Sequence, residues 1–135
     1  KYFSGTAIYR KDIELAGEDL NSDGAVILDL GKVKNIAEVT VNDEPLGTLW
    51  KPPFRIDITK ALKVGSNKVE VEVTNLWVNH LIGDQQKTAD RREDYKAYTT
   101  MQFYNEDSKL LDSGLLGPVK LKVTMLENGK PNIHQ

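Results

Sequence analysis

The chain has 135 residues, with 18 lysine and arginine residues against 20 aspartate and glutamate residues, a formal net charge of -2, and no cysteine. The lack of cysteine excludes disulfides, thiol nucleophiles and thiolate metal sites, and the nearly balanced charge argues against nucleic acid as a partner. No apolar run approaches the roughly 20 residues that span a bilayer, so we expect no membrane partner.

The length is that of one domain, large enough to fold on a hydrophobic core alone. We expect this domain to cover residues 1–126, followed by a tail or linker over residues 127–135. The chain begins at Lys1 and its first residues contain no apolar leader, which we interpret as the sign of a piece of a longer polypeptide.

Alternation of apolar and polar residues predicts most of the secondary structure. The first strand is expected over residues 7–15, where Tyr9 and Ile13 alternate with charged side chains. Residues 42–45 predict the turn of a hairpin, and the Pro52-Pro53 pair should end strand pairing after its second arm. The other expected strands cover residues 25–30, 36–41, 46–50, 54–58, 69–73 and 119–123.

Three segments lack this alternation. Residues 59–63 predict one turn of helix, capped by Asp57 or Thr59. Residues 75–84 are apolar and aromatic without clean periodicity and predict a structured loop or a bulged strand, while residues 85–94 predict an exposed polar loop. Many short strands, frequent turn residues and almost no helix predict an all-β fold, an antiparallel jelly-roll β-sandwich.

Support for a nucleophilic enzyme is weak. The chain has no G-x-S-x-G motif and only two histidines, of which His134 lies in the tail, so a serine triad would depend on His80. Strand acids such as Glu70 and Glu72 alternate, and we expect them to share the solvent face. We expect no catalytic residue, and a stand-alone enzyme using His80 with nearby acids stays an open alternative.

A short acidic segment matches half of a calcium-binding motif. Asp19, Asn21 and Asp23 stand at alternate positions before Gly24, as at the start of a calcium loop. The twelfth position is Leu30, where a bidentate glutamate should stand, and the flanking segments predict strands. We therefore favour a polar turn, with a structural calcium ion as the alternative and no other cofactor.

One segment after the 69–73 strand concentrates side chains that suit carbohydrate. Aromatic rings pack on the C–H faces of sugars, while amides, imidazoles and carboxylates hydrogen-bond paired hydroxyls. The same residues could instead pack within the protein, because a tryptophan beside a strand is more often part of the core. The candidate contact residues are Trp77, Asn79, His80 and Asp84, with Trp50, Tyr95 and Tyr98 as neighbours.

Residues 46–84, LGTLWKPPFRIDITKALKVGSNKVEVEVTNLWVNHLIGD, resemble the galactose-binding-like β-sandwich of glycoside hydrolases. They are most similar to the sugar-binding-type module of family 2 enzymes and to the carboxyl-terminal sandwich of bacterial α-L-rhamnosidase-like proteins. Residues 2–15 and 113–121 resemble the first and last signatures of the same module, so the resemblance covers nearly the whole chain. In one departure, His80 stands where the pattern N-x-W-x-N-R-L-I-G-D has arginine.

The resemblance implies a non-catalytic accessory domain of a larger, secreted or periplasmic, α-L-rhamnosidase-like glycoside hydrolase whose catalytic carboxylates lie on a separate barrel domain. Its partners would be carbohydrate, the catalytic domain of the parent chain, or both. A purely structural interdomain module without sugar binding is the alternative. The module commonly has residues before the YFSG block, and a missing edge segment would leave apolar sheet exposed.

Overall fold

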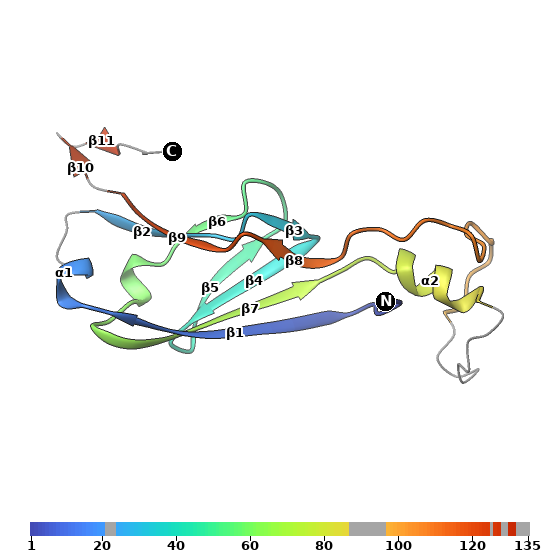
Figure 1. The fold of residues 1–135 in the computed structure, drawn as a ribbon, viewed down its shortest axis with the longest axis horizontal. Coiled ribbons are helices and arrows are strands. Elements are labelled where there is room, and N and C mark those ends of the chain that lie inside the picture. Colours follow the sequence, from blue (N-terminus) through green and yellow to red (C-terminus); the bar gives the residue numbers. More distant parts are fainter. Residues whose placement is uncertain (21–23, 87–96, 125, 128–129, 132–135) are drawn as a thin grey trace.

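The computed structural model describes residues 1–20, 24–86, 97–124, 126–127 and 130–131. Within these residues the fold consists mainly of antiparallel strands with little helix, which confirms the predicted all-β class (Figure 1). The strands are β1 Thr6–Leu15, β2 Ala25–Asp29, β3 Lys32–Lys34, β4 Ile36–Val41, β5 Glu44–Leu49, β6 Arg55–Asp57, β7 Gly65–Thr74, β8 Gly114–Gly117, β9 Lys120–Thr124, β10 Leu126–Glu127 and β11 Lys130–Pro131. The helices are α1 Gly17–Leu20, the 3-10 helix η1 Thr59–Ala61, and α2 Val78–Asp84.

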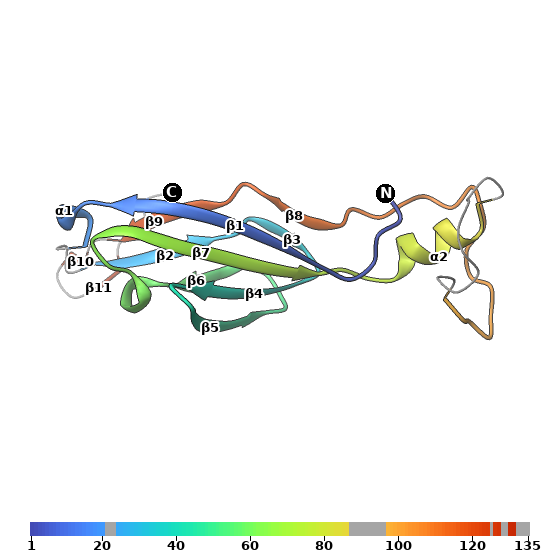
Figure 2. The ribbon, with the colours of Figure 1, turned by 90° about the horizontal axis from the view of Figure 1, so that it is seen from below.

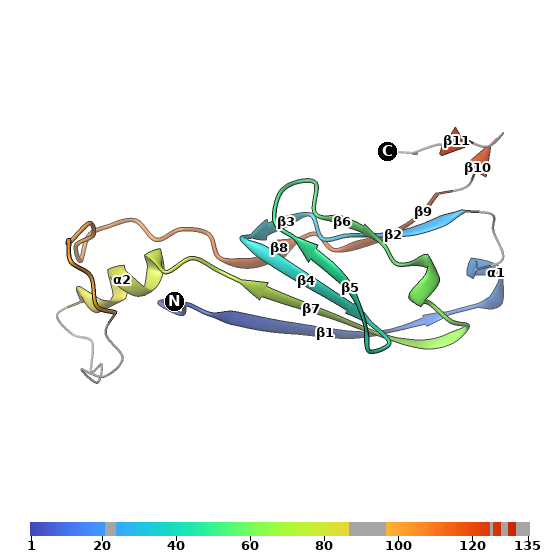
Figure 3. The same ribbon diagram turned by 180° about the vertical axis from the view of Figure 1, so that it is seen from behind.

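Two sheets form the layers of a sandwich. One sheet has four strands in the order β1-β7-β4-β5, and the other has three in the order β6-β2-β9. Strand β3 follows β2 along the chain and β8 precedes β9, and β3 and β8 pair with each other in a separate two-stranded sheet (Figure 3). Strands β1 and β9 are edge strands that line a common cavity, whereas β5 and β6 are the edge strands that meet on the opposite side.

The core lies between the layers and follows the predicted alternation. Val69, Val71 and Val73 of β7 are all buried, and Val71 pairs with the buried Val39 of β4. Glu70 lies on the outer face of the same strand and forms an ion pair with Arg10 of β1. Period-two patterning is therefore a direct consequence of one face of each sheet being removed from water.

Local signals place the connections as expected, except that the N-cap residue of η1 is Ile58 and not Asp57 or Thr59. Asn42 and Asp43 adopt left-handed backbone angles, φ 52° and 66°, and join β4 to β5 by the predicted hairpin turn. Asp57 Oδ1 accepts a hydrogen bond from Thr59 N at 2.9 Å, and the bonds from Thr59 to this carboxylate lower the pKa of Asp57. Thr59 Oγ1 in turn accepts a bond from Val26 N, which fixes η1 against β2.

The structure corrects the prediction for residues 75–84. They were expected to form a structured loop or bulged strand, but the last part of the segment forms helix α2. The short strands β3 and β8, which the alternation did not indicate, pair with each other. Strands β10 and β11 pair within residues 126–131, and the domain boundary at residue 126 stays a prediction. In the described ranges, every helix is too short or too polar to cross a membrane.

Candidate functional site

The long connection from β7 to β8 projects beyond both sheets, at the end of the molecule where the N-terminus lies (Figures 1 and 3). We call its described residues, 75–86 and 97–111, the arm. Helix α2 forms its first half and an irregular segment returns toward β8. The arm contains most of the candidate residues from the sequence, so its construction decides which of their side chains are available.

Asn79 is used to build the arm. Its Nδ2 donates to Leu111 O and its Oδ1 accepts from Leu111 N, both at 2.8 Å, and the residue is only 5% exposed. The Asn79 side chain thus satisfies the backbone N–H and C=O of Leu111, which lies in an irregular segment outside the strands. Both of its polar atoms are therefore engaged within the chain.

His80 and Asp84 lie one turn apart on α2. His80 Nε2 is 3.6 Å from Asp84 Oδ2, and the same carboxylate oxygen accepts a 2.9 Å bond from Ala97 N. The Asp84 side chain is buried, so it connects the helix to the returning segment of the arm. The polar residues of α2 thus hold the two halves of the arm together.

Large apolar side chains remain exposed on the arm. Trp77 is 66% exposed, so its ring does not belong to the sandwich core as a tryptophan beside a strand often does. Tyr98 is also highly exposed, while Tyr95 lies outside the described residues. The other exposed apolar residues of the arm are Leu76, Met101, Phe103 and Leu111.

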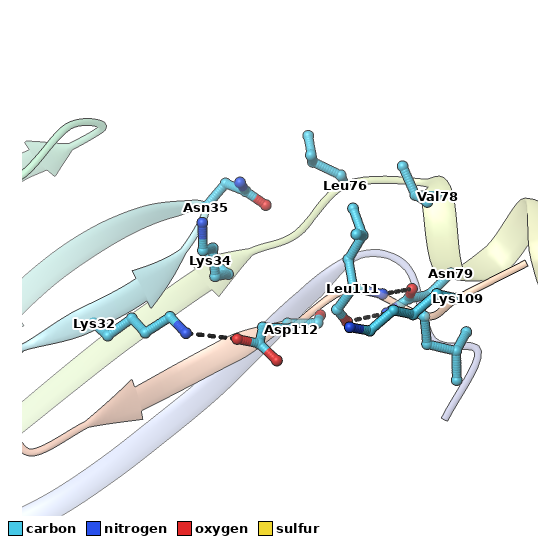
Figure 4. Close-up of a pocket in the computed structure, with 11 residues that line it drawn as sticks. Lys32, Lys34, Asn35, Leu76, Val78, Asn79, Lys109, Leu111 and Asp112 are labelled. Atoms are coloured by element: carbon cyan, nitrogen blue, oxygen red, sulfur yellow. Dashed lines mark hydrogen bonds and ion pairs between the residues drawn. The ribbon is translucent and has the colours of Figure 1, made fainter.

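A cleft of about 430 Å³ opens where the arm meets the sandwich (Figure 4). Lys34 and Asn35 line one wall, at the end of β3, and Lys109 and Asp112 line the other, on the chain that returns to β8. Lys32 Nζ donates to Asp112 across the cleft, and this bond lowers the pKa of Asp112. The cleft therefore combines cations, an amide and a carboxylate in one concave surface.

A second hollow of about 450 Å³ adjoins the cleft, because Lys34 and Asn35 line both. Trp50 stands in it with its side chain 67% exposed. The ammonium group of Lys51 lies 5.0 Å from the centre of the Trp50 ring and covers one of its faces. One aromatic face beside two polar side chains is the pattern that we expect of a weak sugar-binding surface.

The predicted candidates do not all meet at one place. Asn79 lines the cleft, Trp50 lines the adjoining hollow, and Asp84 lines a separate small hollow of about 30 Å³ on the arm. The cleft lysines were missed by sequence reasoning. One signal for two of them was present, because Lys32 and Lys34 alternate around the buried Val33 and so share a face.

The proposed calcium ligands cannot be placed. Asn21 and Asp23 lie outside the described residues, and only the backbone of Asp19 is described, within α1. Among the described residues, no group of three or more histidine, aspartate or glutamate side chains is arranged to hold a metal ion.

Comparison with known proteins gives a consistent result. The family model described as glycosyl hydrolase 2 galactose-binding domain-like matches residues 3–108. A Formosa agariphila protein, provisionally named a β-glucuronidase, is 43% identical over 143 residues, which cover 91% of this chain and 12% of that protein. The chain is thus similar to a small part of a much longer polypeptide.

Solved structures agree with this result. The rhamnosidase from Novosphingobium sp. PP1Y is 43% identical with a TM-score of 0.79, over 89% of this chain and 11% of that one. A family 2 glycosyl hydrolase from Bacteroides cellulosilyticus shares the fold at 18% identity, with a TM-score of 0.58 over 90% of this chain and 12% of that one. The chain spans about one ninth to one eighth of the length of these proteins.

Proposed function

Because this chain belongs to the glycosyl hydrolase 2 galactose-binding domain-like family, we propose that it is the non-catalytic β-sandwich module of a larger glycoside hydrolase, and that its arm packs on the catalytic domain of that enzyme. The observation that carries the proposal is the arm itself. It projects from the sandwich and exposes Trp77, Met101 and Phe103 to solvent. Exposed large apolar side chains on a projecting segment mark surfaces that other domains cover.

The construction of the arm supports contact with a domain. Asn79 and Asp84 use their side-chain polar groups inside the arm, whereas the ring of Trp77 points to solvent. Interdomain surfaces typically place aromatic side chains at their centre with a polar rim. The Lys32–Asp112 pair beside the arm would belong to such a rim.

The state of the carboxylates supports a non-catalytic role. A glycosidase acid must hold a raised pKa beside a second carboxylate. In the described residues, each carboxyl group with a resolved shift has a lowered pKa, namely Asp29, Asp57 and Asp112. Each of these carboxyl groups accepts hydrogen bonds from cationic or hydroxyl donors, which stabilise its ionised form and make it a poor proton donor.

Hydrogen exchange in two polypeptides tests the proposal. Backbone amides of the arm should exchange more slowly in the parent polypeptide than in the 135-residue chain. The hairpin turn at Asn42 and Asp43 lies at the other end of β4, and its amides should exchange equally in both polypeptides. Equal exchange of the arm in both polypeptides would contradict packing on another domain.

For the parent polypeptide we propose an α-L-rhamnosidase-like glycoside hydrolase, secreted or periplasmic. The support is the 43% identity to a solved rhamnosidase. A relative at the same identity is provisionally named a β-glucuronidase, so the assay must separate two sugars. Nitrophenyl α-L-rhamnoside and nitrophenyl β-D-glucuronide, each given to the parent polypeptide and to the 135-residue chain, provide that separation. Turnover by the 135-residue chain alone would overturn the non-catalytic assignment.

The cleft and the Trp50 hollow favour carbohydrate as a second ligand. Lys34 and Asn35 stand between an exposed aromatic face and the Lys109 and Asp112 side chains of the opposite wall. A few such contacts contribute about 0.5 to 1.5 kcal/mol each beyond burial, so affinity should be weak. NMR titration with rhamnose, galactose and pectic oligosaccharides should shift the Lys34 and Asn35 amides. Trp50→Ala should abolish the shifts and Trp77→Ala should keep them; unshifted spectra at millimolar sugar would exclude this role.

A further inference from the structure

Strand β9 directs apolar side chains into the sandwich and yet leaves them half exposed. Leu121 and Val123 pair directly with Leu28 and Val26 of β2, which are buried in the core. Residues directly opposite in an antiparallel pair lie on the same face of the sheet. Leu121 and Val123 therefore face inward, although they are 40% and 49% exposed. The interior of the sandwich is open along this edge.

The opening is a groove of about 410 Å³ between β1 and the β8–β9 strands, which run beside each other (Figure 2). We call it the edge slot. Its walls and floor are mainly apolar, and they include Tyr9, Ile13, Leu28, Leu115, Val119 and Leu121. The volume is roughly two to three times that of the ~150 Å³ apolar cavity that holds one benzene molecule, so several side chains would fit.

Both borders of the edge slot are strand edges with no partner among the described residues. Strand β1 pairs only with β7, and β9 pairs only with β2. Each therefore presents a row of unpaired backbone N–H and C=O groups. Free edges beside an apolar floor are what an added β-strand requires, because the edge supplies backbone bonds and the floor accepts alternate side chains.

The two edges run in the same direction. A further cavity of about 390 Å³ continues past Tyr9, and there Phe3 and Ala7 lie with Leu111 and Ser113. Farther along, Ile13 shares the edge slot with Leu121, so residue numbers rise together on both sides. A single inserted strand can thus run antiparallel to both edges at once. Antiparallel pairing is the more stable arrangement per residue.

We propose that an extended β-strand of the parent polypeptide, the segment that leads into Lys1, fills the edge slot. This rests on the proposed function, which places the module in a polypeptide about eight times longer, as the curated relative is. A segment that reaches Lys1 and reverses there runs against β1, which is the required direction. Asn75 fixes the residues after the reversal, since its Oδ1 accepts from Gly5 N at 2.9 Å and its Nδ2 donates to Phe3 O at 2.9 Å.

The residues around the slot also specify the chemistry of this strand. It should carry apolar side chains at alternate positions, facing Leu28 and Leu121. Lys11 stands in the inward row between Tyr9 and Ile13, so the strand should place an acidic side chain opposite it. Tyr9 Oη accepts a hydrogen bond from Leu115 N at 3.2 Å and joins the two borders of the slot there. Strand pairing should therefore end beside Tyr9, and the segment should pass outside this contact on its way to Lys1.

The test compares the 135-residue chain with the parent polypeptide. In the parent, amides of β9 and β1 that do not bond to β2 or β7 should exchange roughly tenfold more slowly or better, because a partner now holds them. Leu121→Ser should lower the midpoint of thermal unfolding more in the parent than in the 135-residue chain. Ile8→Ser is the matched control, because Ile8 is 47% exposed on the outer face of β1 and should have the same effect in both.

Other outcomes would overturn the proposal. Unchanged exchange at β9 in the parent would do so. Slow exchange at β9 in the 135-residue chain, at concentrations where sedimentation shows a dimer of that chain, would also do so, because a second copy would then fill the slot. Protection that persists when the segment before Lys1 is deleted from the parent would assign the slot to another strand. Slow exchange in the arm with unchanged exchange at β9 would leave the proposed function standing and reject only this inference.

Discussion

Asn79 holds the backbone of Leu111 from both sides, with Nδ2 donating to Leu111 O and Leu111 N donating to Oδ1, each over 2.8 Å. We predict that Asn79→Ala costs about 1 to 3 kcal/mol of unfolding free energy, because it leaves a backbone donor and acceptor without their partner. Urea denaturation measures the loss, and hydrogen exchange of residues 97–111 should show where the structure loosens.

Two variants define the origin of this effect. Asn79→Asp keeps an acceptor for Leu111 N but places a second carboxylate oxygen against Leu111 O in a buried position. At neutral pH it should therefore destabilise the fold at least as much as Asn79→Ala. Lys109→Ala removes an exposed neighbour and should change stability by less than about 0.5 kcal/mol. Unchanged exchange at Leu111 in Asn79→Ala would show that the amide does not hold the arm.

The strands could be predicted from the sequence because their signal is local. Val69, Val71 and Val73 alternate with polar residues, and burial of one face follows from that pattern alone. Helix α2 could not be predicted in this way. Its segment contains β-branched residues and Gly83 and has no side-chain cap, so it depends on bonds to Leu111 and Ala97 that are remote in sequence.

The candidate site shows the same limit. Aromatic and amide residues in the arm were identified by their chemistry, yet the structure uses Asn79 internally and exposes Trp77. The cleft joins Lys32 to Asp112 across 80 positions of the sequence. Such a meeting depends on β3 pairing with β8, and these two short strands lie far apart in the sequence.

Gly31 and Gly47 differ in the space that is available for a side chain. Both have positive φ, but a Cβ at Gly31 would lie 2.5 Å from the carbonyl atoms of Gly117, whereas no heavy atom of the described residues lies within 4 Å of a Cβ at Gly47. We predict that Gly31→Ala destabilises by about 3 kcal/mol or more and Gly47→Ala by about 1 to 2 kcal/mol. Urea denaturation of both variants checks the order, and equal losses would show that backbone angle alone decides.

Asp29 makes acid stability depend on one carboxylate. A hydrogen bond from Lys122, with further bonds from Gly31 N and Arg55, lowers its pKa to about 2. The folded state therefore binds this proton more weakly than the unfolded chain, whose value is about 3.9. Stability from this group is complete above about pH 4 and is lost as the pH falls toward about 2, by about 1 to 2 kcal/mol after allowance for the partly exposed partners.

Thermal unfolding at several pH values between these limits measures this dependence. Asp29→Asn should unfold at a lower temperature at neutral pH and should lose less stability on acidification than the unchanged chain. Asp107→Asn removes an exposed acid and should keep the slope of the unchanged chain. An Asp29→Asn variant with the full acid slope would assign the acid sensitivity to other groups.

Trp50 and Trp77 are almost equally exposed, at 67% and 66%, and the chain contains no cysteine. Trp50→Cys and Trp77→Cys thus place single thiols at two comparable sites, and both should react with a maleimide at similar rates in the 135-residue chain. In the parent polypeptide, packing of the arm should slow labelling at position 77, because the reactive thiolate must reach solvent. Position 50 should keep its rate, with both read from the labelled peptides by mass spectrometry. If labelling slows at position 50 alone, the interdomain surface lies at the Trp50 hollow and not on the arm. If position 77 reacts at equal rates in both polypeptides, Trp77 is not part of an interdomain surface.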